Sequence, residues 1–332
     1  MTTIGVLGAG SWGTALADLL ARKGHEVRLW AYEPEVADAI NARHDNPLFL
    51  PGCPLAPSLT ATNDAAAAVA GASVVVSVTP SHVVRRVVTP LRDAIAPGTI
   101  VVSATKGIET DTLKLMSDVI TEALPHTRFA ALSGPSFAQE VYQRQPTLVV
   151  AASADPAVAR GVQEIFVTPA FRVYSNADVI GVELGGALKN VMAIAAGILE
   201  GLGLGENTRA ALVTRGLAEM TRLGLALGAD PLTFSGLAGM GDLILTTCGA
   251  LSRNRRLGIA IGKGATLAAY QAEQRTVAEG VNTARAAVRL AARHGVEMPI
   301  TQKVHEVLFE AKSPRASLAE LMERDLKAER WQ

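Results

Sequence analysis

The sequence predicts an α/β domain built on a doubly wound, mostly parallel sheet, followed by an all-α domain. Short apolar runs rich in β-branched residues recur through the first half, helical stretches separate most of them, and the runs stop near residue 180. This alternation is typical of a parallel sheet with helices on both faces, since its strands are buried on both sides. The length of 332 residues also suggests two domains, which we place at residues 1–180 and 181–332.

The individual elements follow from the same patterns. Strands are expected over residues 3–8, 26–32, 73–80, 99–105, 128–134, 147–153 and 171–175. Helices are expected in the second half over residues 178–200, 207–228, 253–262, 279–294, 299–311 and 315–329, with Asn207 capping the second of them.

Composition narrows the function classes. The chain has 31 basic and 31 acidic residues, so no overall field attracts nucleic acid or anionic membranes, and any anion site must be local. Two cysteines are too few for a disulfide framework, and the start lacks the basic region of a signal peptide. The most apolar stretch, 181–204, contains Glu183, Lys189 and Glu200, which favours a buried helix over a membrane span. We expect a cytoplasmic protein with no nucleic-acid partner, no integral membrane segment and no metal.

The stretch "GAGSWG" follows the first strand directly and opens a helix. In that context Gly8 permits a tight turn, Gly10 lets the backbone approach a pyrophosphate, and Gly13 lets helix and strand pack closely. The helix N-terminus then offers N–H groups and positive dipole to phosphates. Ser11 can donate to a phosphate and Trp12 can cover the dinucleotide. These features predict a Rossmann-type dinucleotide site, the alternative being a glycine-rich turn without a ligand.

The second strand ends with "LWAYEPE", which places Glu33 about twenty positions after the glycines, behind Tyr32. An acidic residue there usually binds the ribose hydroxyls of NAD, whereas an arginine accommodates the extra phosphate of NADP. The sequence thus leans toward NAD(H) or toward use of both dinucleotides, although a glutamate can also turn to solvent. Segment 46–58, with four prolines, is expected to be an ordered surface loop on the cofactor side.

One lysine stands among small and apolar residues in "GGALKNVMAIAAGI". The helical neighbours of Lys189 within two turns include small residues, namely Gly185, Gly186, Ala193, Ala196 and Gly197. Something large can lie against such a face. The alternative is a lysine that extends along its own stem to the surface.

Two later segments are candidates for binding an anion and for orienting this lysine. Ser252 is expected to cap the helix that starts with Arg253, and cations there oppose the helix dipole unless a phosphate binds. That phosphate would be held by backbone N–H groups, guanidinium and Asn254. The alternative pairs the arginines with carboxylates, which we expect for at least one of them. Asp242 either caps its helix or accepts from Lys189, and the two roles are compatible.

Two further segments follow strands of the first half, where ligands of open α/β sheets bind. "SATKGIE" places Lys106 just past one strand end, and "LSGPSFAQE" places Gly134 and Ser136 past another.

Together these residues resemble a known family. The stretches "GAGSWGTALA", "ATKGIE", "SGPSFA", "GVELGGALKNVMAIAAG", "RGLAEM", "GLAGMGDL", "SRNRRLG" and "EGVNT" occur in an order and at spacings similar to those of bacterial NAD(P)-dependent glycerol-3-phosphate dehydrogenase, from about residue 3 to residue 312. The resemblance implies reduction of dihydroxyacetone phosphate to sn-glycerol 3-phosphate with NAD(H) or NADP(H), supplying phospholipid synthesis.

The resemblance also implies residue roles. Lys189 matches the proton donor and acceptor. The positions that match substrate contacts are Lys106, Gly134, Ser136, Lys189, Asp242, Ser252, Arg253 and Asn254. The positions that match cofactor contacts are Ser11, Trp12, Tyr32, Lys106, Ala138, Arg253, Val277 and Glu279, in addition to Gly8, Gly10 and Gly13. The sequence departs from many NADP-preferring members at 31–33, where "AYE" has no basic residue.

Two alternatives remain. β-Hydroxyacid dehydrogenases and ketopantoate reductases share the broad architecture, but typically place an asparagine one turn after the lysine, where this chain has Ala193 and an adjacent Asn190. A dinucleotide-sensing regulatory protein would need no arginine cluster. The sequence leaves the oligomeric state open, and a homodimer is one of the states it allows.

Overall fold

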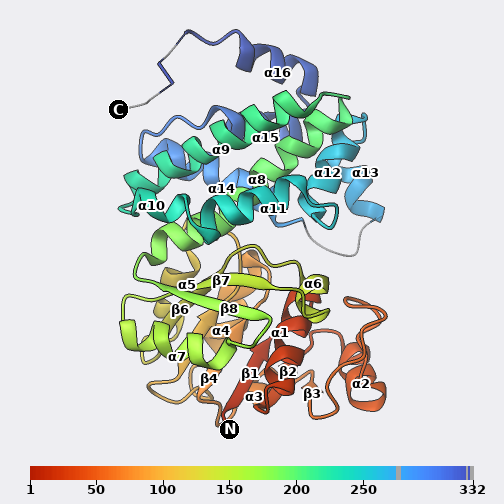
Figure 1. Cartoon of the computed structure of the whole chain (residues 1–332), viewed down its shortest axis with the longest axis vertical. Coiled ribbons are helices and arrows are strands. Elements are labelled where there is room, and N and C mark those ends of the chain that lie inside the picture. The colour runs from red at the N-terminus through yellow and green to blue at the C-terminus, as the bar shows by residue number, and fades with distance from the viewer. Residues whose placement is uncertain (274–277, 327, 330–332) are drawn as a thin grey trace.

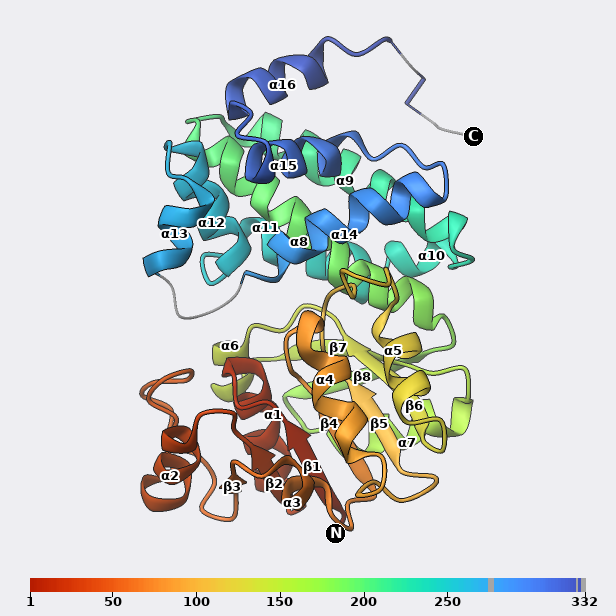
Figure 2. The same ribbon diagram turned by 180° about the vertical axis from the view of Figure 1, so that it is seen from behind.

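The computed structural model describes residues 1–273, 278–326 and 328–329 (Figure 1). These residues form an eight-stranded sheet with helices on both faces, and a helical layer stacked on one end of that sheet (Figures 1 and 2). The predicted fold class, a mostly parallel Rossmann-type domain followed by an all-α domain, is confirmed.

The sheet has the order β3-β2-β1-β4-β5-β6-β7-β8. Neighbouring strands are parallel except β6 and β7, which pair antiparallel. The strands are β1 (Thr3–Leu7), β2 (Glu26–Trp30), β3 (Thr60–Thr62), β4 (Val74–Ser77), β5 (Ile100–Ser103), β6 (Arg128–Ser133), β7 (Thr147–Ala152) and β8 (Phe171–Asn176). All seven expected strands are present, and the sequence pattern missed only β3, a three-residue edge strand too short to show a period.

The helices of the first domain cover both faces of the sheet. They are α1 (Ser11–Arg22), α2 (Pro34–Arg43), α3 (Ala65–Val69), α4 (Val84–Val88), α5 (Met116–Ala123), α6 (Ala138–Tyr142) and α7 (Pro156–Phe166). Val76 and Val102 pack in one core with residues of α1, α2 and α7. Val75 and Val101, one residue earlier on the same strands, pack in a second core with α4 and α5. Successive residues thus face opposite layers, as a doubly wound sheet requires.

The second half is helical. Its helices are α8 (Val179–Gly201), α9 (Glu206–Ala226), α10 (Pro231–Phe234), α11 (Asp242–Cys248), α12 (Arg253–Gly262), α13 (Leu267–Glu273), α14 (Glu279–Arg293), α15 (Pro299–Phe309) and α16 (Pro314–Met322), with a π-helical turn at Leu237–Gly241. Two expectations were wrong in detail. α9 is capped by Gly205 rather than Asn207, and the last helix ends at Met322.

Helix α8 is the centre of the helical domain. It is long and apolar enough to span a membrane by composition, but 89% of its apolar window is buried inside the protein, as expected for a core helix. The C-terminal part of its small-residue face packs on helix α12, whereas Gly185 faces Ala238 and Gly186 faces Ser133. A Cβ added to Gly197 would lie 2.1 Å from Arg255 O, and one added to Gly258 would lie 2.1 Å from Ile194 O. The two helices therefore pack backbone against backbone, which requires these glycines.

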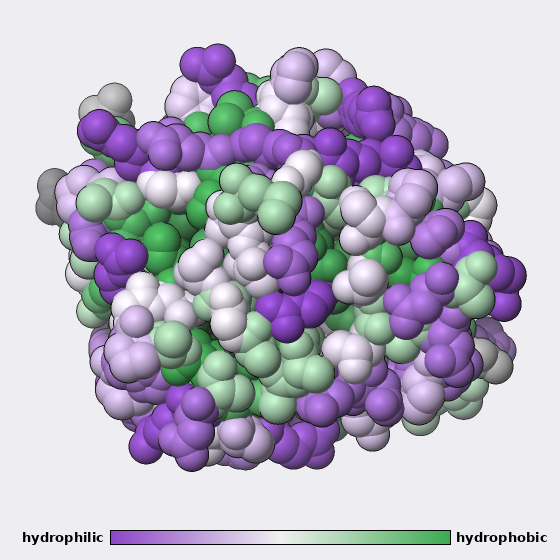
Figure 3. Space-filling view, turned by 90° about the horizontal axis from the view of Figure 1, so that it is seen from below, coloured by the Kyte–Doolittle hydropathy of each residue, from purple (hydrophilic) through white to green (hydrophobic). Residues whose placement is uncertain are grey.

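The carboxyl ends of the parallel strands face the helical domain. Figure 1 shows the chain beginning at the far end of the sheet, so that β1 runs toward the helices. Figure 3 shows the face of the sheet domain that lies away from the helical domain, where hydrophilic and hydrophobic residues are intermixed. The residues singled out at strand ends, including Lys106 after β5 and Gly134 after β6, consequently lie between the two layers.

Candidate active site between the sheet and the helical domain

The glycine turn has the geometry that a dinucleotide site needs. Gly8 has φ +116°, which is strained for other residues, and a Cβ on Gly13 would lie 1.9 Å from Gly8 O. A Cβ on Gly10, by contrast, would meet nothing within 4 Å. Gly10 caps α1 without a side-chain hydrogen bond, so N–H groups of the first turn are available beside open space. The turn is thus tight where it packs and open where a pyrophosphate would approach.

The residues around this turn also fit a dinucleotide. Ser11 Oγ donates to Phe49 O at 2.5 Å, which ties the proline-rich loop 46–58 to the turn, as expected for a loop on the cofactor side. Trp12 is half-buried, and its indole Nε1 has no hydrogen-bond partner among the residues that the structure describes. Ala138 begins α6, which packs against α1. In this structure the Ser11 hydroxyl thus donates its proton to the loop, and the donors left beside the open side of the turn are the first-turn N–H groups and the indole N–H of Trp12.

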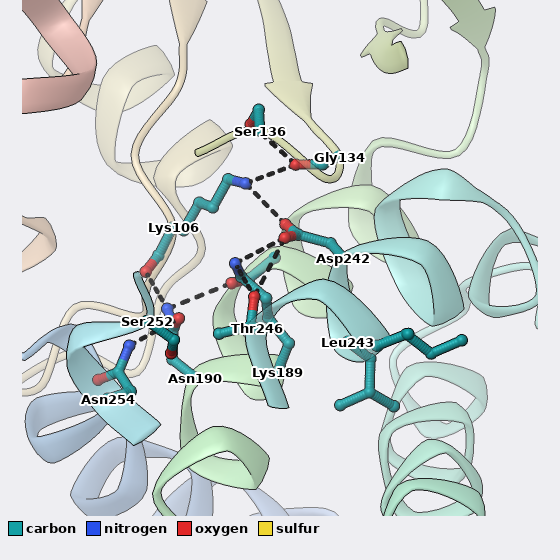
Figure 4. Close-up of polar contacts among 12 residues, drawn as sticks. Lys106, Gly134, Ser136, Lys189, Asn190, Asp242, Leu243, Thr246, Ser252 and Asn254 are labelled. Atoms are coloured by element: carbon teal, nitrogen blue, oxygen red, sulfur yellow. Dashed lines mark hydrogen bonds and ion pairs between the residues drawn. The ribbon is translucent and has the colours of Figure 1, made fainter. Parts of the chain in front are cut away.

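The buried centre of the site is a chain of charged groups (Figure 4). Lys189 Nζ donates to Asp242 Oδ1 at 2.7 Å and to Thr246 Oγ1 at 2.7 Å. Lys106 Nζ donates to Asp242 Oδ2 at 2.6 Å and to Gly134 O at 2.9 Å. Only 7% of Lys189 and none of Asp242 is exposed, so Lys189 does not extend to the surface. One carboxylate therefore holds two ammonium groups, one from each domain.

The surroundings of this pair shift both pKa values. Burial lowers the pKa of Lys189 to about 8, although the Asp242 charge raises it. Burial by itself raises the pKa of Asp242, but the charges of Lys106 and Lys189 outweigh it and hold that pKa below its ordinary value. Asp242 is therefore ionised at neutral pH, while Lys189 titrates close enough to neutrality to exchange a proton. Asp242 is in the first turn of α11 but does not cap it, because Gly241 is the cap.

The N-terminus of α12 lies beside this chain. Ser252 caps the helix as predicted, because its Oγ accepts from Arg255 N at 3.2 Å. Arg255 pairs with Glu200 at 2.6 Å, which confirms that one of the three arginines neutralises a carboxylate. Arg253 is accessible to solvent, yet enough protein surrounds its guanidinium for desolvation to lower its pKa, against the Glu279 charge that raises it. Arg253 does not take part in the ion pair with Glu200, and it borders the buried site.

The amide of Asn254 is engaged inside the protein. Its Nδ2 donates to Asn190 Oδ1 at 2.9 Å, and its Oδ1 accepts from Gly280 N at 2.9 Å. Asn190 Nδ2 in turn donates to Lys106 O at 3.3 Å. The side chain of Asn254 therefore joins α12 to α8 and α14, and its backbone N–H is the group left to face a ligand.

The remaining sequence-predicted residues fall into two groups. Ser136 Oγ donates to Gly134 O at 2.9 Å, and Glu279 accepts from Ser81 Oγ at 3.0 Å, so both lie in the junction near Lys106. Tyr32 is 74% exposed beyond β2, where its ring contacts Trp30 edge-on. Four strand spacings separate β2 from β6, about 19 Å, so Tyr32 lies at the opposite end of an extended site. Val277 lies outside the described residues.

The sequence analysis missed several polar groups. Thr246 binds both Lys189 and Asp242, and its position one turn after Asp242 on an expected helix could have identified it. Ser77, Ser103 and Ser133, which end β4, β5 and β6, are buried with hydroxyls unpaired within the described part of the chain. The repeated serine at the ends of "VVVS", "IVVS" and "AALS" was visible in the sequence.

A cavity of about 800 Å³ lies away from this site, between α8, α9, α15 and α16. Its described lining, which includes Leu212, Ile300 and Leu318, contains none of the candidate residues. Within the described ranges, no group of three or more His, Cys, Asp or Glu side chains is placed to hold a metal ion.

Comparison with known proteins identifies the family of this chain. The family model described as "NAD-dependent glycerol-3-phosphate dehydrogenase N-terminus" matches residues 3–159, and its C-terminus counterpart matches residues 178–319. The chain belongs to the NAD-dependent glycerol-3-phosphate dehydrogenase family. This membership places it among the oxidoreductases that use NAD(H) or NADP(H).

Relatives and structures support the membership along the whole chain. A protein of Geobacter sulfurreducens named "Glycerol-3-phosphate dehydrogenase [NAD(P)+]" is 60% identical over 331 residues, 99% of each chain. The crystal structure of glycerol-3-phosphate dehydrogenase from Coxiella burnetii is 42% identical, with a TM-score of 0.94 over 97% of this chain and 99% of that one. A ketopantoate reductase from Ralstonia eutropha, 18% identical with a TM-score of 0.60 over 96% of this chain and 99% of that one, shares the fold alone.

Proposed function

We propose that this family member reduces dihydroxyacetone phosphate to sn-glycerol 3-phosphate, reversibly, with Lys189 as the proton donor and acceptor. The observation that carries the proposal is the buried contact of Lys189 with Asp242, beside the α12 N-terminus and at the edge of the sheet that holds the glycine turn. Residues 1–180 would bind the dinucleotide, and residues 181–332 would supply the lysine and the phosphate site.

The nicotinamide, when bound, supplies the hydride that the ketone carbon accepts. The chain's own task is to manage the charge on the ketone oxygen. The Lys189 ammonium stabilises the negative charge that grows on that oxygen and then donates a proton, which leaves a neutral amine that solvent reprotonates. A pKa of about 8 suits this exchange. Asp242 and Thr246 hold the Nζ atom in position, and neither needs to give up a proton.

The substrate phosphate would bind at the start of α12. The backbone N–H groups of Arg253 and Asn254 and the Arg253 guanidinium are the donors there, since the Asn254 amide is engaged and Arg255 pairs with Glu200. Lys106, Gly134 and Ser136 would line the opposite side of the substrate. Binding energy from the phosphate positions the remote carbonyl for reaction.

The proposed cofactor contacts divide between the two ends of the extended site. Gly8, Gly10, Ser11, Trp12 and Gly13 would hold the pyrophosphate and cover the dinucleotide, with Tyr32 at its adenosine end. The nicotinamide end would meet Lys106, Ala138, Arg253, Glu279 and Val277.

An absorbance assay tests the proposal. Protein with NADH or NADPH should lose the reduced-nicotinamide absorbance when dihydroxyacetone phosphate is added, and far more slowly with unphosphorylated dihydroxyacetone or ketopantoate. Turnover with ketopantoate alone would favour the ketopantoate reductase alternative. Dinucleotide binding without turnover of any ketone would favour the regulatory protein.

We further propose that the product supplies phospholipid synthesis and that the protein acts in the cytoplasm, as a homodimer. Two free cysteines, Cys53 and Cys248, are consistent with a reducing compartment. Depletion of the protein should stop lipid synthesis unless glycerol 3-phosphate is supplied, cell fractionation tests the compartment, and light scattering after gel filtration gives the mass.

A further inference from the structure

The adenosine end of the dinucleotide site carries acidic groups where the 2′-phosphate of NADPH would have to bind. We infer that this enzyme prefers NADH to NADPH and that the carboxylate of Glu33 sets the preference. This inference rests on the proposed function for its substrate, but its central observation concerns only dinucleotide binding.

Glu33 lies where the ribose of a bound dinucleotide is expected. β2 pairs in parallel with β1, and Gly8 N of the glycine turn donates to Trp30 O at the end of β2 at 3.1 Å. The chain then reaches Glu33, the N-cap of α2, within three residues. A dinucleotide whose pyrophosphate sits on the glycine turn places its adenosine ribose at the end of this second strand.

The Glu33 side chain is available to that ribose. It is half-buried, and within the described chain it makes no capping hydrogen bond to α2. Only its main-chain carbonyl is used by the helix, accepting from Val36 N at 3.1 Å. A free carboxylate at this position can accept hydrogen bonds from the two ribose hydroxyls of NADH.

The same surroundings offer little to a 2′-phosphate. Pro34 occupies the first position of α2 and has no N–H to donate, and Glu35 adds a second negative charge to the first turn. Past β3, Asp64 caps α3 and adds a third acidic group at the neighbouring strand end. A phosphate here would face carboxylates and a weakened helix N-terminus.

The first part of the sequence brings no compensating cation to this end. Residues 1–84 contain only four lysines and arginines, namely Arg22, Lys23, Arg28 and Arg43. Arg22 and Lys23 lie at the other end of α1, and Arg28 donates to the carbonyls of Ala67 and Ala70. Arg43 is in the last turn of α2, about 15 Å along the axis from Glu33, and pairs with Asp45.

The electrostatic consequence is a preference against the doubly charged phosphate. A 2′-phosphate carries nearly two negative charges at neutral pH, and like charges about 4 Å apart disfavour binding even in a solvated site. We therefore expect NADH to bind at least about tenfold more tightly than NADPH.

The experiment measures dissociation constants for NADH and NADPH by fluorescence titration of the full chain without ketone, and kcat/KM for both with dihydroxyacetone phosphate. Glu33→Gln should reduce the discrimination by weakening NADH and strengthening NADPH, and Glu33→Arg should reverse it. Glu35→Gln removes an equal charge two residues away and should shift the ratio much less than Glu33→Gln does, because Glu35 is exposed and solvent screens its charge.

Equal or tighter binding of NADPH by the unchanged protein would overturn the inference. So would a Glu33→Gln variant with an unchanged ratio, or a Glu35→Gln variant that shifts the ratio as much as Glu33→Gln does. Failure of the enzyme to reduce the ketone would count against the proposed function alone, because the binding titration needs no turnover.

Discussion

The ammonium group of Lys189 lies 2.7 Å from Asp242, and the other oxygen of the same carboxylate lies 2.6 Å from the ammonium group of Lys106. Lys189 and Asp242 come from the helical domain, whereas Lys106 follows a strand of the sheet. The contact therefore joins the two domains at the point where the proposed chemistry takes place. It also keeps a buried lysine charged without pairing it so strongly that it cannot give up its proton.

Replacing Lys189 by alanine should abolish turnover and leave dinucleotide binding near normal. A positioned general acid typically contributes about 10²- to 10⁴-fold, and the glycine turn does not depend on this side chain. Steady-state rates and a dinucleotide titration measure the two effects. Lys114→Ala, at a surface lysine that pairs with Glu122, serves as the control. A Lys189→Ala enzyme that keeps most of its activity would rule out the proton-transfer role.

The rate of ketone reduction should fall as pH rises through about 8, because the reaction needs the protonated form of Lys189. The reverse oxidation needs the neutral amine and should rise over the same range. Asp242→Asn removes the charge that raises the Lys189 pKa while the opposing Lys106 charge remains, so both midpoints should move to lower pH. The pH profiles of kcat/KM in both directions measure this. Midpoints that stay fixed or move upward would contradict the assignment.

Arg253→Ala should raise KM for the phosphorylated ketone. It should lower kcat/KM by an amount that corresponds to a loss of about 2–3 kcal/mol of transition-state stabilisation, as for a lost charge-assisted hydrogen bond. Arg256→Ala is the matched control, since this exposed arginine lies in the same helical turn and should cost less than about 1 kcal/mol. Comparison with unphosphorylated dihydroxyacetone isolates the phosphate contribution. If both variants behave alike, the phosphate binds elsewhere.

Glu183→Gln should stabilise the protein at alkaline pH. Glu183, on α8, accepts from Ser117 N at 2.9 Å and from Ser117 Oγ at 2.5 Å, and burial raises its pKa from 4.5 to about 8. The folded state binds this proton more tightly than the unfolded state does, so the protonated group stabilises the fold fully below about pH 4.5. That contribution is lost as pH rises through about 8. A tenfold difference in proton affinity between the folded and unfolded states corresponds to about 1.4 kcal/mol, so wild type should lose a few kcal/mol between pH 5 and pH 8.5 that the glutamine variant keeps. Urea unfolding at both pH values measures the difference, and equal losses in the two proteins would contradict it.

Gly258→Ala should destabilise the helical domain by about 3 kcal/mol or more. The new methyl group would lie 2.1 Å from Ile194 O, a backbone atom that can move only if α8 and α12 separate. Gly205→Ala is the control, since a Cβ there meets nothing within 4 Å and only the helix cap weakens, by less than about 1 kcal/mol. Denaturant midpoints compare the two variants. A Gly258→Ala protein as stable as wild type would show that the interface relaxes at little cost.

The layers of the fold could be predicted from the amino-acid sequence, because the apolar runs of a buried parallel sheet and the spacing of long helices are local properties of the chain. The glycine turn was equally predictable, and Gly8 and Gly13 have the tight geometry that their spacing implied. Strand β3 was not, because its three residues are held in place by β2 rather than by any period of their own.

Which charges meet depends on packing between distant segments. Lys106 and Asp242 are 136 residues apart in the sequence, with Lys189 between them. No local sequence pattern predicts that one carboxylate binds both lysines. The same holds for the arginines of α12, of which packing assigns Arg255 to Glu200. The balance of burial and charge that sets the Lys189 pKa depends on distances between elements, and those exist only once the helices and the sheet have packed together.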